Sequence, residues 1–596
     1  MSAAVNTLRR WQGLCFIITT LMLPGVAWAL SLEVRVTGVE NELEQNVLAL
    51  LTIYQERRES ELTLERLQYL HRRAPEQITT ALAPFGYYQV QVAAHLQPDN
   101  AHSEQWNADY QIVLGEPVKI AAVNYHITGD GATNPHFPAQ FPLRVGDVLR
   151  HSEYTAGRAE LERIAASEGY LDAELLQHAV LVDPIANTAT VNIELATGPR
   201  YYLGAVRFQQ ALLKPKFLQR FVPFKPGAVY DPGQLLTLQS RLLGSEYFDR
   251  VEIKPLKDQA GAQRIVPIDV IAHPNKANKY RVGLGMATDI GPRLTLDYRR
   301  RYLWQSGHQL KTEMMVAAAL QTWESEYRIP IRNPLQDYLL IRPELTLQDT
   351  TARSGSAFRL QAAHSVRIRN GWRRTIGLDY RYENYTITDS SAENDSDQFN
   401  GLVPSIAWSK VVADDPVNTR NGYRLKALLQ GTTPSLFAPT TWLSMTANAK
   451  WIKTISDNYR LISRADVGAV FADELADVPA SQRFFAGGDN SVRGFGFEAL
   501  GPNDPITDAS IGGRYLTVGS FELERELNNA GANMSMAAFT DFGNAFDPDY
   551  PSEWHHSVGV GLRYSTPIGR IRFDLAYALT KTEPGVRLHV LIGPDL

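Results

Sequence analysis

The stretch Arg483–Phe497 combines four glycines, four aromatic residues and an internal arginine, Arg493. A connection between two strands ordinarily needs only a few small polar residues, so this composition indicates a loop that is buried in protein. The chemistry it offers is ion pairing, because a buried guanidinium without a carboxylate partner is strongly unfavourable. The alternative is a surface arginine in a glycine turn. Whether Arg493 is buried or exposed depends on the elements that surround it.

Residue patterns typical of catalysis are absent from the sequence. It contains no Gly-x-Ser-x-Gly, phosphate-binding glycine loop or His-Glu-x-x-His motif. His555 and His556 are adjacent on a predicted strand and therefore point to opposite faces, so they cannot form one metal site by themselves. Asp414 and Asp415 precede Pro416 in a predicted turn and are better explained as capping or solvated residues. We therefore expect a protein that is not an enzyme, with no catalytic residues, cofactor or metal.

The amino terminus has the features of a secretory signal peptide. Arg9 and Arg10 precede the apolar run Leu14–Leu23, and Ala27–Ala29 supplies small residues at alternate positions, which predicts residues 1–29 as a cleaved signal. The alternative is a membrane anchor. The one cysteine, Cys15, lies in this segment, so the mature chain would have no thiol, which suits a bacterial envelope compartment. The net charge of -5 gives no reason to expect nucleic acid as a partner.

The first half of the chain repeats itself. Gly86 and Gly169 are 83 residues apart in similar surroundings, and Gly115 and Gly198 have the same spacing. Each unit reads as a strand, two helical stretches and two strands, with the glycine where a helix passes into a strand. A third copy ends near residue 275, and there Ser245-Glu246 stands in place of the glycine.

After residue 275 the pattern changes to strict alternation. Ile571–Leu579 places apolar residues on one face and Arg572, Asp574 and two alanines on the other, and Tyr280–Ala287 alternates in the same way. After residue 30 there is no apolar run long enough for a transmembrane helix, so entry into a membrane would require a closed barrel. We count sixteen strand segments. The tract 389–397 and the loop 471–512 follow odd-numbered strands, so both would lie on the same, external side.

The β-α-α-β-β unit resembles the polypeptide-transport-associated (POTRA) domain. Three such repeats before a sixteen-strand barrel, with Val492–Phe495 in the long loop and Phe539–Gly543 on a later strand, resemble the outer-membrane insertase superfamily that includes BamA. Three repeats rather than five, and the ending Ile592–Leu596, are most similar to the TamA group of that superfamily. The expected fold is thus three α+β POTRA repeats and a sixteen-stranded antiparallel transmembrane β-barrel. The expected segments are 30–115, 116–197 and 198–275 for the repeats and 276–596 for the barrel, with 471–512 as the lumen-folded loop.

The resemblance implies a role for the loop. In the family it folds into the lumen, and its arginine binds acidic residues on the strands that follow. The resemblance implies the same attachment of the loop to the barrel wall here, which we call the loop lock. It consists of Arg493, Gly494 and Phe495, with Asp541 and Glu522 as the partners of the guanidinium. Asp541 lies on the same predicted strand face as Phe539 and Gly543.

A closed barrel has one seam, where its first strand meets its last. The first strand contains Gly283 and Gly285, and the last ends in Gly593 and Pro594; glycine weakens a strand and proline removes a ladder donor. Together with the family resemblance, this seam implies an outer-membrane insertase that passes unfolded outer-membrane or autotransporter clients sideways by strand augmentation. The alternatives are a passive polypeptide-export pore of the two-partner secretion type, or a porin. Two-partner transporters typically have two repeats and a plug helix, and we expect no such helix before Leu32.

The expected location is the bacterial outer membrane, with the lipid bilayer around the barrel and the repeats in the periplasm. The edge strands of the repeats could bind clients or partners by backbone hydrogen bonds, or the repeats could serve only as spacers. The resemblance also implies an inner-membrane partner resembling TamB.

Overall fold

The computed structural model describes residues 31–59, 62–99, 105–287, 290–350, 352–387, 396–504, 510–527, 533–566, 569–580 and 585–593. The predicted signal peptide and Pro594 lie outside these ranges. The chain forms two compact units, one that runs to Tyr201 and includes Val229–Asp231, and one that holds Tyr202–Ala228 and the chain from Pro232 onward.

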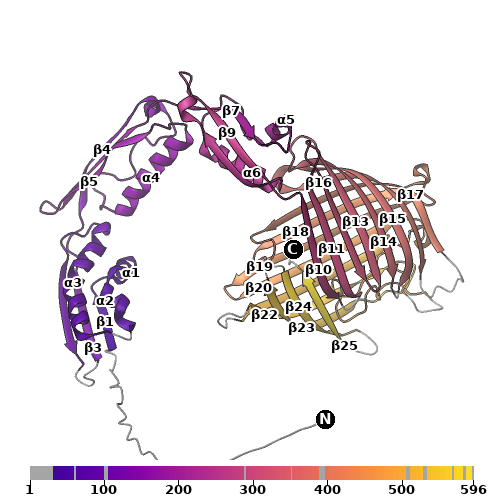
Figure 1. The fold of residues 1–596 in the computed structure, drawn as a ribbon. Helices are drawn as coiled ribbons and strands as arrows, with labels where there is room; N and C mark the ends of the chain where they lie inside the picture. Colours follow the sequence, from indigo (N-terminus) through magenta and orange to yellow (C-terminus); the bar gives the residue numbers. More distant parts are fainter. Residues whose placement is uncertain are drawn as a thin grey trace, which may run out of the picture. The chain divides into compact units, whose positions relative to one another are not determined.

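The first unit contains two α+β repeats, each with a three-stranded sheet (Figure 1). In each sheet the last strand in sequence lies in the middle, parallel to the first strand and antiparallel to the second. The elements are β1 (Ser31–Thr37), α1 (Asn41–Leu50), α2 (Thr52–Gln55), η1 (Glu56–Arg58), α3 (Leu64–Leu82), η2 (Ala83–Phe85), β2 (Gln91–Pro98), β3 (Gln105–Val113), β4 (Lys119–Thr128), η3 (Asp130–Thr133), α4 (His151–Ser167), β5 (Glu174–Asp183) and β6 (Thr188–Ala196).

Local sequence explains these elements. Helix α3 begins where the Thr63 hydroxyl accepts a hydrogen bond from the Arg66 N–H, and its apolar residues recur at helical spacing on the buried face. Gly86 and Gly169 both have φ values in the left-handed region, as expected where a helix turns into a strand. The second repeat differs from the expected pattern of two helices, because only the short 3-10 turn η3 precedes α4.

The third repeat belongs to the second unit and has the same strand order. At its helix-to-strand junction Glu246 adopts φ 62, so the non-glycine residue takes the left-handed conformation that glycine takes in the other two repeats. Its elements are β7 (Tyr202–Gln209), α5 (Pro215–Leu218), η4 (Gln219–Phe221), α6 (Pro232–Gly244), β8 (Phe248–Pro255), η5 (Lys257–Gln259) and β9 (Ile265–Pro274).

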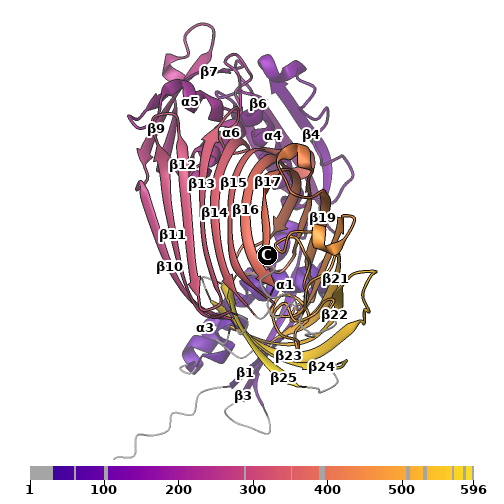
Figure 2. The ribbon, with the colours of Figure 1, turned by 90° about the vertical axis from the view of Figure 1, so that its right-hand side faces the viewer.

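Sixteen antiparallel strands follow and confirm the predicted count. They pair in sequence order from β10 to β25 and curve into a barrel (Figure 2). The strands are β10 (Asn278–Ala287), β11 (Gly291–Leu303), β12 (His308–Ala317), β13 (Leu320–Pro330), β14 (Asp337–Asp349), β15 (Arg353–Arg367), β16 (Arg373–Ile387), β17 (Ser396–Ala413), β18 (Gly422–Thr432), β19 (Trp442–Ser456), β20 (Tyr459–Phe471), β21 (Tyr515–Glu526), β22 (Met534–Phe546), β23 (His555–Thr566), β24 (Gly569–Ala578) and β25 (Val586–Gly593), with short 3-10 turns η6 (Arg369–Gly371), η7 (Pro434–Leu436) and η8 (Leu475–Asp477).

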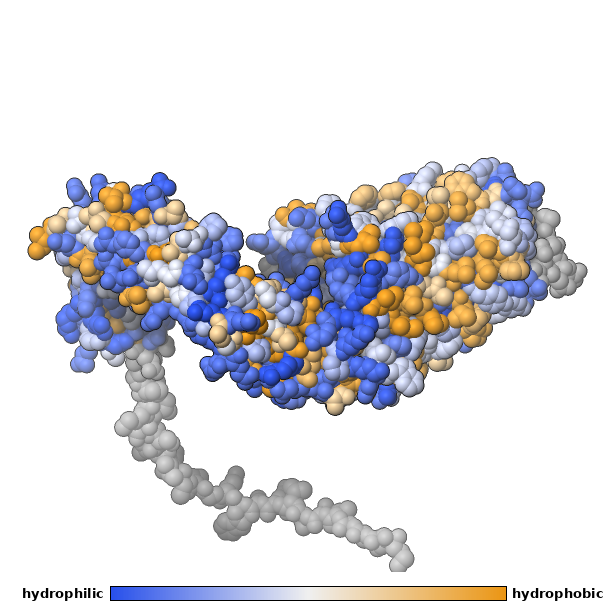
Figure 3. Space-filling model, turned by 90° about the horizontal axis from the view of Figure 1, so that it is seen from above, coloured by the Kyte–Doolittle hydropathy of each residue, from blue (hydrophilic) through white to orange (hydrophobic). Residues whose placement is uncertain are grey.

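The predicted alternation decides which side chains face out of the barrel. On β24 Phe573, Leu575 and Tyr577 are exposed, whereas Asp574 and Ala576 are each 1% exposed because they face the lumen. The apolar residues of β10 are also exposed, and Figure 3 shows apolar side chains gathered on the visible outer wall of the barrel. This outward apolar surface is what a barrel in a bilayer requires.

None of the helices in the described ranges is both long enough and apolar enough to cross a membrane.

Candidate functional site: the lumen loop and the seam

The described residues of the long connection between β20 and β21, 472–504 and 510–514, fold into the barrel lumen. The connection runs from 472 to 514, so β21 begins slightly later than the sequence predicts. Its apolar residues form a buried cluster with the lumen face of the wall, where Leu516 and Val518 of β21 contact the loop. These two residues share a strand face with Glu522, and the loop explains why apolar and charged residues occur together on that face. The cluster consists of Ala486, Val492, Phe495, Leu500, Val518 and Ala578.

Arg493 is buried and contacts three carboxylates. Its Nε and Nη2 donate to the two oxygens of Asp541 at 2.8 and 2.9 Å, and Nη1 donates to Glu522 at 2.9 Å and to Asp574 at 3.1 Å. The guanidinium carbon lies 3.3 Å from the ring centroid of Phe539. The structure thus brings Arg493 together with both carboxylates expected from the sequence and adds a third. Bidentate pairing with Asp541 fixes the orientation of the guanidinium.

The strand ladder places these carboxylates. Ser520 on β21 is the register partner of Asp541 on β22, and its hydroxyl donates to Asp541 Oδ1 at 2.6 Å. Glu522 lies two residues further along β21, so its side chain points into the lumen beside Asp541. Asp541 is 0% exposed and also accepts the backbone N–H of Arg493 at 3.0 Å. The lumen faces of β21, β22 and β24 thus present the carboxylates that bind the Arg493 guanidinium.

A second buried arginine, Arg563 on β23, binds two of the same carboxylates. It donates to Glu522 at 2.7 Å and to Asp574 at 2.5 Å, and its Nε lies 3.4 Å from Glu524. The sequence analysis did not name Arg563 or Asp574 as site residues. The alternation along 571–579 already assigned Asp574 to the polar face of its strand. A comparison of the charged residues on the inward faces of neighbouring strands could therefore have identified Arg563 and Asp574 as a pair.

Gly494 and Phe495 seat the loop on the last strands. Gly494 has φ 99, and a Cβ there would lie 3.1 Å from the Ala578 nitrogen and 3.2 Å from the Ser557 Cβ. Only glycine fits this close approach without strain. The Phe495 ring packs edge-on against His555 with centroids 5.0 Å apart. His555 and His556 do point to opposite sides of β23, as expected.

The seam lies between β10 and β25. These strands come within 8 Å of each other (Cα to Cα), but no ladder joins them in the part of the chain that the structure describes. Gly283 and Gly285 lie on the lumen face of β10. Gly285 leaves room for the Arg293 side chain, since a Cβ at position 285 would lie 2.6 Å from Arg293 Nε. Gly593 pairs with Arg570 of β24. The side of β10 that faces β25 therefore has no ladder in the described residues.

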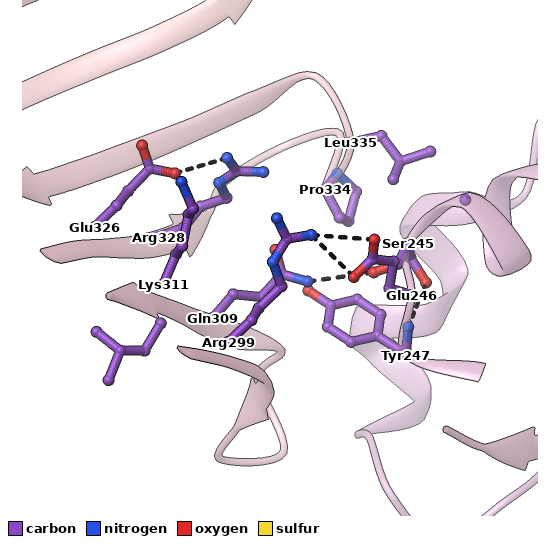
Figure 4. Close-up of a pocket in the computed structure, with 12 residues that line it drawn as sticks. Ser245, Glu246, Tyr247, Arg299, Gln309, Lys311, Glu326, Arg328, Pro334 and Leu335 are labelled. Atoms are coloured by element: carbon purple, nitrogen blue, oxygen red, sulfur yellow. Dashed lines mark hydrogen bonds and ion pairs between the residues drawn. The ribbon is translucent and has the colours of Figure 1, made fainter. Parts of the chain in front are cut away.

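The third repeat is docked against the barrel turns. The Glu246 carboxylate accepts from Arg299 Nη1 at 3.1 Å, and Gln309 donates to the Ser245 carbonyl at 3.2 Å. A cavity of about 210 Å³ lies at this contact, and its charged lining residues include the ion pairs Glu246–Arg299 and Glu326–Arg328 (Figure 4). The Tyr247 hydroxyl donates to the Gly307 carbonyl in the β11–β12 turn. These contacts hold the third repeat against the turns of the barrel.

Within the described ranges, no group of three or more His, Cys, Asp or Glu side chains is arranged to hold a metal ion.

Three POTRA-like repeats before a sixteen-stranded barrel, with an arginine-bearing loop locked inside it, define a class of membrane barrel proteins. The Omp85 superfamily domain matches residues 277–593, and the chain belongs to this superfamily. The POTRA domain described as TamA domain 1 matches residues 33–114, and the repeat described as surface antigen variable number repeat matches residues 201–271.

Curated relatives and a solved structure match the chain at low sequence identity. The chain is similar to the outer membrane protein assembly factor BamA of Nitratidesulfovibrio vulgaris (24% identity; 35% of this chain, 28% of the relative) and of Neisseria meningitidis (20% identity; 74% and 62%). It spans less than two thirds of the length of these curated relatives. The crystal structure of BamA from Haemophilus ducreyi lacking POTRA domains 1–3 matches with a TM-score of 0.69 at 16% identity, covering 80% of this chain and 99% of that one.

Proposed function

We propose that this protein is a TamA-type outer-membrane insertase, which receives unfolded outer-membrane or autotransporter clients at the seam between β10 and β25. The edge of β10, which no ladder pairs in the described residues, carries this proposal. A strand with free backbone groups beside an apolar outer wall can accept a client strand by β-augmentation and pass it sideways into lipid. Each added strand satisfies its backbone groups against its neighbour, so the reaction needs neither a nucleotide nor covalent chemistry.

The lumen loop supports insertion over passive conduction. Arg493 and the apolar residues around it fix a large plug to the wall, and the same plug would obstruct a polypeptide-export pore or a porin channel. Relatives named as outer membrane protein assembly factors also favour assembly. The proposed location is the bacterial outer membrane, with the repeats in the periplasm after removal of residues 1–29.

Cysteine pairs across the seam test this proposal. The predicted mature chain has no cysteine, so pairs placed on β10 and β25 would report only on the seam. Oxidation of a seam pair should abolish assembly of an unfolded eight-stranded outer-membrane barrel into vesicles that contain the protein, and reduction should restore it. Matched pairs between β11 and β12, which already share a ladder, should leave assembly unchanged. Full assembly with the seam locked would refute lateral insertion, and steady conductance of the locked protein would favour the pore.

The first repeat is the proposed docking site for an inner-membrane partner resembling TamB. The match of residues 33–114 to the first POTRA domain of TamA supports this assignment. A pull-down from envelope extracts with residues 30–275 should capture such a partner, and removal of residues 30–115 should abolish its capture.

A further inference from the structure

The last strand, β25, is attached to the lumen loop by a buried histidine. His589 is 0% exposed and its Nδ1 hydrogen-bonds to the Asp489 carboxylate in the loop. Its Nε2 lies 3.4 Å from the backbone nitrogen of Gly494, next to the lock arginine. A backbone N–H only donates, so Nε2 accepts and Nδ1 carries the proton that goes to Asp489. Both ring nitrogens therefore bind the same loop.

The loop is in turn fixed to the strands beside β25. Arg493 binds Asp574 on β24, and Asp574 is the register partner of His589. The neighbouring residues Asp574 and His589 thus hold the loop from two strands at the same level of the barrel. Through Glu522 and Asp541 the attachment continues to β21 and β22. The loop and the strands from β21 to β25 are tied into one body.

The other side of the seam has no such attachment. In the described part of the chain, the side-chain hydrogen bonds, ion pair and ring contact of β10 all go to β11: Asn278 accepts from Tyr298 and Arg300, Arg281 pairs with Asp297, and Tyr280 contacts Tyr298. Lumen-facing Gly283 and Gly285 offer no side chain for the loop to bind. The two edges of the seam are therefore held unequally.

We propose that His589 is a positioning residue that anchors β25 to the lumen loop, so that β25 is the fixed edge of the seam and β10 is the edge that moves. This inference rests on the proposed seam function and specifies how the seam opens. The anchor restrains β25 in addition to its ladder with β24, whereas the described contacts of β10 are its ladder and side-chain contacts with β11.

Amide hydrogen exchange of the full-length protein in phospholipid vesicles tests the anchor without any client. In the unaltered protein, residues 586–593 should exchange more slowly than residues 278–287. His589→Ala should speed exchange of 586–593 by about 10-fold or more, the factor expected for losing a hydrogen bond to a charged group. His589→Asn should restore much of the protection, because its amide nitrogen occupies the position of Nδ1 and can still donate to Asp489.

Two further variants keep the test decisive. Val586→Ala changes an exposed residue on the outer face of the same strand and should leave the exchange of β25 unchanged. If His589→Ala fails to fold, Asp489→Asn removes the negative charge with little change in shape and should also speed the exchange of β25. Unchanged exchange of β25 in both anchor variants, or faster exchange of β25 than of β10 in the unaltered protein, would overturn the proposal. The client assay with locked cysteines answers separately whether the seam is used for insertion.

Discussion

Replacing Arg493 by alanine tests how much the loop lock stabilises the barrel. The change leaves Glu522 and Asp574 with Arg563 as a remaining partner, but it takes the guanidinium from Asp541, which is 0% exposed. Breaking a buried ion pair by removing one partner costs about 3–5 kcal/mol, because the other charge stays buried without compensation. That loss is a large fraction of a total stability of about 5–15 kcal/mol. Guanidinium unfolding in detergent, followed by tryptophan fluorescence, should show it.

A second substitution separates charge from packing. Adding Asp541→Asn to Arg493→Ala should recover part of the lost free energy of unfolding, because it neutralises the carboxylate left unpaired. Arg483→Ala serves as the matched control, since Arg483 lies in the same loop and pairs with Asp397 at 3.3 Å. It should cost less than Arg493→Ala, because its guanidinium pairs with a more exposed carboxylate. The reasoning is refuted if the double variant is less stable than Arg493→Ala, or if Arg493→Ala costs no more than Arg483→Ala.

Three further predictions concern backbone strain and pH. Gly494→Ala should destabilise the barrel by about 1–3 kcal/mol, as measured by guanidinium unfolding, because φ 99 strains any other residue. Glu246→Gly should leave the free energy of unfolding unchanged or raise it. Glycine adopts φ 62 without strain, and this gain offsets the loss of the partly exposed ion pair with Arg299, which is worth about 1 kcal/mol or less. Arg299→Ala removes the same ion pair without relieving the strain, so it should only destabilise. Burial lowers the pKa of His151, which bonds to Tyr88, below its ordinary 6.5. The unfolded chain then binds the proton more readily than the folded chain. Thermal unfolding of residues 31–201 should therefore show a stability that is steady above pH 6.5 and falls below it. The fall should be less steep in His151→Gln.

The local patterns in the sequence were sufficient for the architecture. Alternation alone assigned the outer and lumen faces of β10 and β24, because a strand has a period of two and only one face can meet lipid. The spacing of Gly86 and Gly169 located the repeats, because a helix that turns into a strand needs a residue that accepts positive φ. The sequence did not explain why the third repeat lacks this glycine. In the structure Glu246 adopts the strained conformation and binds Arg299 of the barrel.

The site depended on contacts between distant segments. The composition around Arg493 predicted a buried cation, and family resemblance named Asp541 and Glu522, but Asp574 lies 81 residues away and the His589–Asp489 pair is separated by 100 residues. No local period relates residues so far apart. Their proximity follows from the strand register and from a loop that crosses the lumen, both of which form only when the sheet curves. The sequence by itself determined which faces and which charges exist; the tertiary structure decided which charges meet, because closing the barrel brings its last strands to the loop.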